Sequence, residues 1–173
     1  CPDCDVLIEP QSEDAIVARL LREYRGETVV MLAPLVMNRK GVYTDLAKWA
    51  AAKGYTHLRV DGGFLPTDKW PRLSRFQEHT IELPVADVRV TPGNEPLLRE
   101  GLARALEFGK GVAHMLGNLD SLALAMAQRD PSLVDMAQTV FSVKRACPSC
   151  GTSFSELDPR LFSFNSKHGW CTA

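Results

Sequence analysis

One continuous apolar run, Thr-Val-Val-Met-Leu-Ala over residues 28–33, most constrains what this chain can fold into. It begins with β-branched residues and shows no polar alternation. Such a run is typical of a central strand that is covered on both faces. We therefore expect a sheet built around residues 28–33, with Pro34 ending the strand.

Helices are predicted before and after this run in the sequence. Apolar residues recur at helical spacing over 13–24, 44–53, 97–108 and 119–129. Ser12 is placed to cap the first helix, and Gly54 supplies a left-handed position after the second. The polar residues 35–43 and the proline-containing residues 64–73 are predicted to be irregular.

Further strands are predicted from alternating or short apolar patterns over 55–61, 79–90, 112–116 and 139–143. Gly62-Gly63 has the chemistry of a hairpin turn. Because Pro84 cannot donate a ladder hydrogen bond, the strand that contains it should lie at a sheet edge or break there. The elements together predict an α/β or α+β fold, with helices packed on a small mixed sheet.

Four of the five cysteines form two Cys-Pro-x-Cys pairs, Cys1/Cys4 and Cys147/Cys150. This spacing lets two thiolates face one zinc ion, and Cys171 offers a third thiolate. The pattern favours metal sites in a reducing compartment, with a disulfide inside one pair as the alternative in metal-free protein. Structural zinc needs four ligands, so we expect an incomplete zinc-knuckle site at Cys147, Cys150 and Cys171, and missing partners for Cys1 and Cys4.

These motifs divide the chain into three predicted parts. Residues 1–10 would be a flank with half of a zinc site, residues 11–143 an interaction domain, and residues 144–173 a truncated zinc module. A globular unit with metal-bearing segments at both ends is typical of an insertion into a larger host domain.

Composition and motifs argue against several functional classes. The formal net charge of −1 gives no bulk electrostatic reason to bind nucleic acid, so any such contact must be local. No apolar run approaches the roughly 18 residues of a membrane helix and no signal-peptide pattern occurs, so we expect a cytoplasmic protein. Nucleophile–base pairs, convergent carboxylates and phosphate-cradling loops leave no local trace. We therefore interpret the chain as an interaction module rather than an enzyme.

The candidate partner-binding residues lie in the middle of the chain. Arg39 and Lys40 are adjacent cations in a predicted loop, for which simple solvation is the competing interpretation. His57 and Arg59 should share one exposed face of their strand, open either to solvent or to a partner. Asp87 belongs to the predicted edge strand, and an edge is a place where a partner can dock.

A second interpretation is a DNA-contacting zinc module. Its phosphate contacts would come from Lys144, Arg145, Arg160 and Lys167. This hypothesis predicts salt-sensitive DNA binding that is lost when residues 144–173 are removed.

The C-terminal motifs carry a family resemblance. Cys-Pro-Ser-Cys-Gly at 147–151, followed by Pro-Arg-Leu-Phe-Ser-Phe-Asn at 159–165, resembles the UvrA family of the bacterial ABC excinuclease. Further matches follow in the family's order, at Cys1-Pro-Asp-Cys4, Gln11-Ser12, Arg39-Lys-Gly41, Arg59-Val-Asp61-Gly62 and His79-Thr-Ile-Glu82. The resemblance therefore extends over the whole chain.

This resemblance implies that the domain at 11–143 binds UvrB, the damage-verifying partner, and that the transcription-repair coupling factor Mfd uses the same surface. It implies structural zinc, with the first cysteine pair joining a second pair downstream of this chain. The parent protein would be a dimeric ABC-type ATPase that binds ATP and damaged DNA in nucleotide excision repair, while this segment alone would not be an enzyme.

Two positions depart from the family pattern. Family members often carry basic residues at the positions of His57 and Asp87, where the resemblance implies contact with acidic groups on UvrB. Here Asp87 reverses the charge. Because charge complementarity governs partner choice, the alternative hypothesis is a divergent paralogue whose domain has an altered partner.

Overall fold

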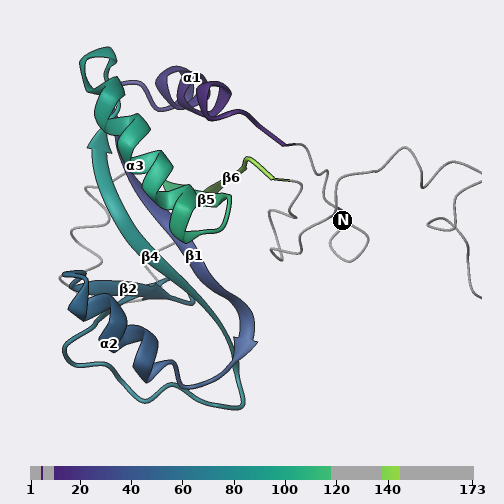
Figure 1. Ribbon diagram of the computed structural model, residues 1–173, viewed down its shortest axis with the longest axis vertical. Helices are drawn as coiled ribbons and strands as arrows, with labels where there is room; N and C mark the ends of the chain where they lie inside the picture. Colours follow the sequence, from purple (N-terminus) through teal and green to yellow (C-terminus); the bar gives the residue numbers. More distant parts are fainter. Residues whose placement is uncertain (1–4, 6–9, 118–137, 145–173) are drawn as a thin grey trace, which may run out of the picture.

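The computed structural model describes residues 5, 10–117 and 138–144, which form a six-stranded antiparallel sheet with three α-helices packed on it (Figure 1). The helices are α1 (Glu13–Glu23), α2 (Thr44–Ala52) and α3 (Glu95–Phe108), with a short 3-10 turn, η1 (Pro92–Asn94), before α3. The strands are β1 (Thr28–Lys40), β2 (His57–Val60), β3 (Gly63–Pro66), β4 (Glu78–Arg89), β5 (Val112–Leu116) and β6 (Gln138–Ser142). Their order is β3-β2-β4-β1-β5-β6, which confirms the predicted α+β class.

Strand β1 is central, as the apolar run predicts, because it pairs with β4 on one side and β5 on the other. The prediction that Pro34 ends this strand is wrong, since β1 continues to Lys40 through most of the predicted loop. The edge prediction for Pro84 is wrong for the strand as a whole, because β4 lies between β2 and β1. It holds locally, since the ladder with β2 covers only Ile81 and Glu82 and leaves Pro84 without a partner on that side.

Both prolines are tolerated inside the sheet because they lie at β-bulges. Pro84 is opposite Leu32, next to a register shift, and Pro34 is opposite Glu82, next to a second shift. A bulge leaves one residue out of the hydrogen-bonding ladder, so a missing N–H costs little there. The sequence showed the prolines but not the bulges that accommodate them.

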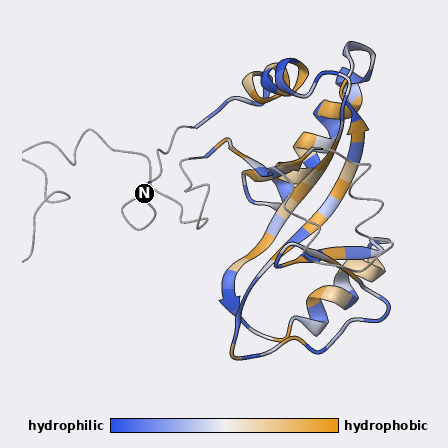
Figure 2. Cartoon of the chain, turned by 180° about the vertical axis from the view of Figure 1, so that it is seen from behind, coloured by the Kyte–Doolittle hydropathy of each residue, from blue (hydrophilic) through white to orange (hydrophobic). Residues whose placement is uncertain are grey.

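Helix α3 lies along β1 and β4 and covers one face of the sheet (Figure 1). Its residues Leu98 and Leu102 are fully buried in the main core. Gly101 allows the close approach, since a Cβ atom built there would lie 2.8 Å from the Met31 sulfur atom. Helix α1 packs beside α3, and α2 contacts β2. Figure 2 shows the apolar residues of β1 beneath α3 in orange and its final residues in blue.

Local signals place the first helix and the hairpin well. The Ser12 side chain accepts a hydrogen bond from the Ala15 N–H at 3.2 Å, which confirms the predicted cap. Val60 pairs with Gly63, so the two-residue turn is Asp61-Gly62, one residue before the predicted position. Both turn residues have positive φ, as a tight hairpin of this kind requires. Strand β3 follows at once, within a segment that was mostly predicted to be irregular.

Within the described residues, no helix is long and apolar enough to cross a membrane. The predicted helix over 119–129 lies outside the described residues.

Candidate functional site

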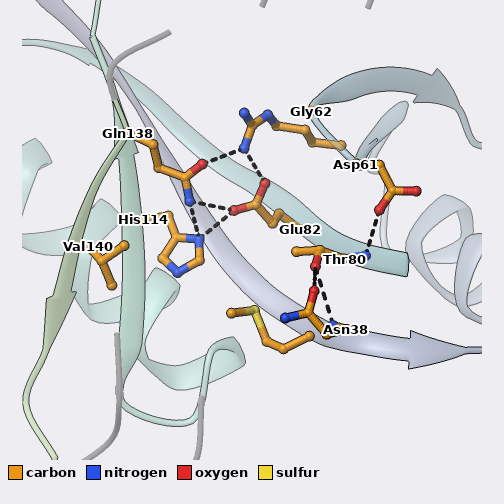
Figure 3. A pocket seen from close by; sticks show the side chains of 10 residues that line it. Asn38, Asp61, Gly62, Thr80, Glu82, His114, Gln138 and Val140 are labelled. Atoms are coloured by element: carbon orange, nitrogen blue, oxygen red, sulfur yellow. Dashed lines mark hydrogen bonds and ion pairs between the residues drawn. The ribbon is translucent and has the colours of Figure 1, made fainter. Parts of the chain in front are cut away.

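Four polar side chains meet on the sheet face opposite α3, and Figure 3 shows three of them by label. This polar cluster consists of Arg59 on β2, Glu82 on β4, His114 on β5 and Gln138 on β6. The first three are buried, and the residues beside them along each strand belong to the core under the helices. Because side chains alternate between the faces of a strand, the cluster residues share the other face.

Glu82 is the centre of this cluster. One of its carboxylate oxygens accepts from Arg59 Nη1, and the other pairs with His114 Nδ1. Gln138 closes the cluster, because its Nε2 donates to Glu82 Oε1 at 3.2 Å and its Oε1 accepts from Arg59 Nη1 at 2.8 Å. Burial alone would raise the pKa of Glu82, but the hydrogen bond from His114 and the charge of Arg59 hold that pKa below its ordinary value.

The cluster forms one wall of a pocket with a volume of about 380 Å³. Asn38, Thr80 and Asp61 lie on its other side (Figure 3). The Thr80 hydroxyl donates to Asn38 Oδ1 at 3.0 Å, and its backbone N–H donates to Asp61 Oδ1 at 2.7 Å. Met37, Gly62 and Val140 complete the lining. The pocket is thus built by five of the six strands and the β2–β3 turn.

The acidic groups of this pocket are already engaged. Both Glu82 oxygens are paired, and Asp61 uses its second oxygen for His79 Nδ1 at 2.7 Å. In the part of the chain that the structure describes, only Arg59 Nε and His114 Nε2 are buried pocket nitrogens without a hydrogen-bond partner. The geometry therefore fits structural pairing and recognition of a polar group better than acid–base chemistry.

His79 fastens the segment before β4 to the sheet. Its Nε2 lies 2.9 Å from the Ser74 carbonyl oxygen, while its Nδ1 bonds Asp61. The hydrogen bond to Asp61 raises the pKa of His79 above its ordinary value, more than offsetting the effect of burial. This imidazole links the hairpin turn to the loop before β4.

The structure separates the predicted partner-binding residues by exposure. Arg39 and Lys40 are exposed, at the end of strand β1 instead of in a loop. His57 is half-buried. The prediction that Arg59 is exposed is wrong, because the residue is only 6% exposed and its side chain is bound to Glu82. An alternating strand shows which residues share a face, but it does not show what covers that face.

Asp87 is exposed but far from the two adjacent cations. It lies opposite Val30, whereas Arg39 lies opposite His79 at the other end of the same strand pair. Nine residues of extended β1 separate these points, a distance of roughly 30 Å. The structure therefore does not bring all of the predicted residues into one patch.

Sequence reasoning missed the roles of Glu82, His114 and Gln138. The alternation of Ile81, Glu82 and Leu83 placed Glu82 on the non-core face, and this was the available signal. His114 sits in a short buried run, and nothing in the sequence links it to a carboxylate 32 residues earlier. Only the strand order brings these groups together.

The zinc and DNA predictions fall largely outside the described residues. All five metal candidates, Cys1, Cys4, Cys147, Cys150 and Cys171, lie there, as do Arg145, Arg160 and Lys167. Lys144 is described and exposed. Among the described residues, no group of three or more His, Cys, Asp or Glu side chains could hold a metal. The zinc site and the DNA contacts remain predictions.

These features define a class of protein: a small α+β domain built on an antiparallel sheet with a buried polar cluster. A family model described as the UvrA interaction domain matches residues 11–118. The match covers more than half of the chain and every residue of the cluster except Gln138. The chain therefore belongs to the UvrA interaction domain family, and the family resemblance found in the sequence is confirmed.

Curated relatives align over nearly the whole chain. UvrABC system protein A from Pseudomonas aeruginosa is 33% identical over 171 residues, which are 99% of this chain and 17% of the relative. The protein of the same name from Staphylococcus aureus strain Mu50 is 33% identical and covered to 16% of its length. That from Escherichia coli O127:H6 is 34% identical, with 17% covered. The chain thus spans about one sixth of the length of these relatives.

Proposed function

We propose that this chain is the protein-interaction domain of a UvrA-type nucleotide excision repair protein and that it recruits UvrB. The observation that carries the proposal is the family match over 11–118, which includes every predicted partner-binding residue. The relatives are named as protein A of the UvrABC system, so UvrB is the natural partner to test. The parent protein would be an ABC-type ATPase that contacts DNA, and Mfd would be a second partner.

The exposed charges support binding to an acidic partner. Arg39 and Lys40 make no ion pair within the described residues, so both cations are available to a partner. Unpaired surface cations raise the rate of encounter with an acidic surface and help to select it. The buried Arg59 supports the proposal only indirectly, by holding β2 against β4.

The pocket chemistry supports a binding role over a catalytic one for this segment. Glu82 is held by three partners and Asp61 by two, so neither is free to take a proton from a substrate. Among the described residues, the Thr80 hydroxyl hydrogen-bonds only Asn38, donating to its amide oxygen, and no carboxylate or imidazole. We therefore assign ATP turnover to the parent protein and not to this chain.

The charge of Asp87 supports the alternative that the domain binds a different partner. Its carboxylate is exposed, where the family resemblance implies a basic residue. An acidic partner surface at that position would be repelled. On this alternative the same domain binds a protein with a different charge pattern.

The proposal is tested by competition. The 173-residue chain, in excess, should reduce the binding of purified UvrB to one of the full-length relatives, because both would occupy the same UvrB surface. The double variant Arg39→Glu/Lys40→Glu should compete less well. The matched control is Arg104→Glu/Lys110→Glu, which reverses two exposed cations, one within α3 and one just after it. If wild-type chain leaves the UvrB complex intact at every concentration tested, the proposal fails.

A further inference from the structure

The end of the sheet where β1 stops and β4 starts gathers exposed apolar and basic side chains. Lys40 lies opposite Glu78 in the β1–β4 register, so the segments that flank these residues meet at one end of the ribbon (Figure 1). We name this surface the basic–aromatic tip and define it by Arg39, Lys40, Val42, Arg75 and Phe76. All five residues are exposed.

Phe76 is the most conspicuous member of the tip. Its side chain is 71% exposed, the largest value among the exposed large hydrophobic residues of the described chain, and Val42 is 39% exposed. The guanidinium of Arg75 lies over the Phe76 ring, 4.6 Å from its centroid. Aromatic and Arg side chains are the residue types that most often carry binding energy at protein interfaces. An exposed Phe stacked under Arg is therefore a candidate anchor.

The tip is held in place by the domain. Trp70 Nε1 donates to the Val42 carbonyl oxygen at 3.3 Å, which joins the two segments that form the tip. The Ser74 carbonyl oxygen bonds both His79 Nε2 and the Gln77 N–H, so the turn that carries Phe76 is fixed to β4. A surface that is already ordered loses less conformational entropy on binding.

The charge of the tip indicates the chemistry of its partner. The tip itself carries three cations, and over the two segments that contain it, residues 39–43 and 68–78, exposed cations outnumber exposed carboxylates by five to two. The carboxylates are Asp68 and Glu78, and Glu78 lies across from Lys40. The two carboxylates would repel a phosphate backbone. A protein surface that is mainly acidic but carries some cations would pair with the cations and with the carboxylates of these segments. The exposed Val42 adds apolar area that a protein partner would cover.

We propose that the basic–aromatic tip docks a mainly acidic protein surface that offers an apolar recess for Phe76, and that this surface belongs to UvrB. The inference rests on the proposed function and names a docking surface for it. Phe76 would enter the recess, while Arg39, Lys40 and Arg75 would face carboxylates around it. The tip lies roughly 30 Å along the ribbon from Asp87, which is several screening lengths at physiological salt, so the reversed charge there acts on the tip only at low salt.

The test measures the affinity of the 173-residue chain for purified UvrB by calorimetry. Phe76→Ser should raise Kd at least about tenfold, as expected for the loss of an aromatic anchor. Lys40→Glu should raise Kd by a similar factor at low salt and by less at high salt, because exposed charges are screened. Leu97→Ser is the matched control, since Leu97 is 54% exposed at the start of α3. All variants should unfold at the wild-type temperature.

Three results would overturn the proposal. Tip variants that bind UvrB within about twofold of wild type would show that UvrB docks elsewhere, while the proposed function would stand. Absence of binding by wild-type chain would remove the proposed function and this inference together. Phe76-dependent binding of a single-stranded oligonucleotide, or Phe76-dependent self-association in sedimentation, with UvrB affinity unchanged, would assign the tip to nucleic acid or to a second copy of the chain.

Discussion

Arg59 on β2 and Glu82 on β4 lie directly opposite each other and form a buried ion pair. The family motifs Arg59-Val-Asp61-Gly62 and His79-Thr-Ile-Glu82 each supply one member. Asp61 and His79 form a second pair between the same two motifs, partly open to solvent. Two motifs that carry the family resemblance in the sequence thus hold the hairpin onto the sheet.

Arg59→Ala should destabilise the domain strongly. Removing one member of a buried pair leaves the other charge without compensation, which typically costs about 3–5 kcal/mol of unfolding free energy. Urea unfolding followed by circular dichroism measures this cost. Arg104→Ala breaks an exposed pair with Glu100 and should change stability little. Equal effects of the two substitutions would contradict the structural role of Arg59.

Lowering the pH should reduce the free energy of unfolding of the domain through Glu82. Its pKa is lowered in the folded state, so its contribution to stability is complete above the ordinary value of 4.5 and is lost as the pH falls through the lowered pKa. Glu82→Gln should therefore show a smaller loss of unfolding free energy on acidification below pH 4.5 than wild type. Parallel pH curves for the two proteins would show that Glu82 does not carry this dependence.

Raising the pH should reduce the free energy of unfolding of the domain through His79. Its pKa is raised in the folded state, so its contribution is complete below the ordinary value of 6.5 and is lost as the pH rises through the raised pKa. Asp61→Asn removes the main cause of that shift and should flatten the stability curve above pH 6.5. An NMR titration of the His79 ring should show the pKa falling in the same variant. An unchanged His79 pKa would count against this pairing.

Gly101→Val should destabilise the packing of α3 on the sheet. A Cβ atom at position 101 would lie 2.8 Å from Met31 Sδ and 3.0 Å from Ala86 Cβ, so the helix or the sheet must shift. Overpacking of this kind costs about 1–3 kcal/mol. Ala103→Val introduces the same side chain at an exposed position of the same helix and serves as the control. A larger cost for Ala103→Val than for Gly101→Val would refute the close approach.

Asp87→Arg should strengthen binding to UvrB. The substitution introduces the basic charge that the family resemblance implies at this exposed position, and a new complementary charge typically changes the association rate more than the dissociation rate. Stopped-flow mixing should show faster association at low salt, with the gain shrinking as salt is added. Glu107→Arg makes the same change of charge at an exposed position near the end of α3, away from Asp87 in the sequence and outside the basic–aromatic tip, and should leave the rate nearly unaltered. Slower association of Asp87→Arg would favour the divergent-partner alternative.

Local chemistry in the sequence predicted much of this fold. The Ser12 cap and the helical spacing of α1 and α3 depend on neighbouring residues, and both helices were placed within two residues. The apolar run gave the start of β1 but not its end at Lys40. Pro34 misled because a β-bulge depends on the partner strand. A bulge is a property of two strands in register and leaves no reliable mark in one of them.

The site was predicted less well than the fold, for a related reason. Adjacency in the sequence made Arg39 and Lys40 candidates for partner binding, which stays a prediction, and alternation placed His57 and Arg59 on one face. The burial of Arg59 depends on Glu82, His114 and Gln138, which come from three other strands. The order of the strands in the sheet decides such contacts, and no local sequence pattern encodes that order.

The binding of UvrB to the chain itself tests the central claim most directly. Calorimetry with the 173-residue chain and purified UvrB should give saturable binding with a Kd below about 50 µM at low salt, weakening as salt rises because exposed cations contribute. The Arg104→Glu/Lys110→Glu control should bind like wild type. A folded chain that shows no saturable binding at that concentration, in low salt, would contradict the proposed recruitment of UvrB.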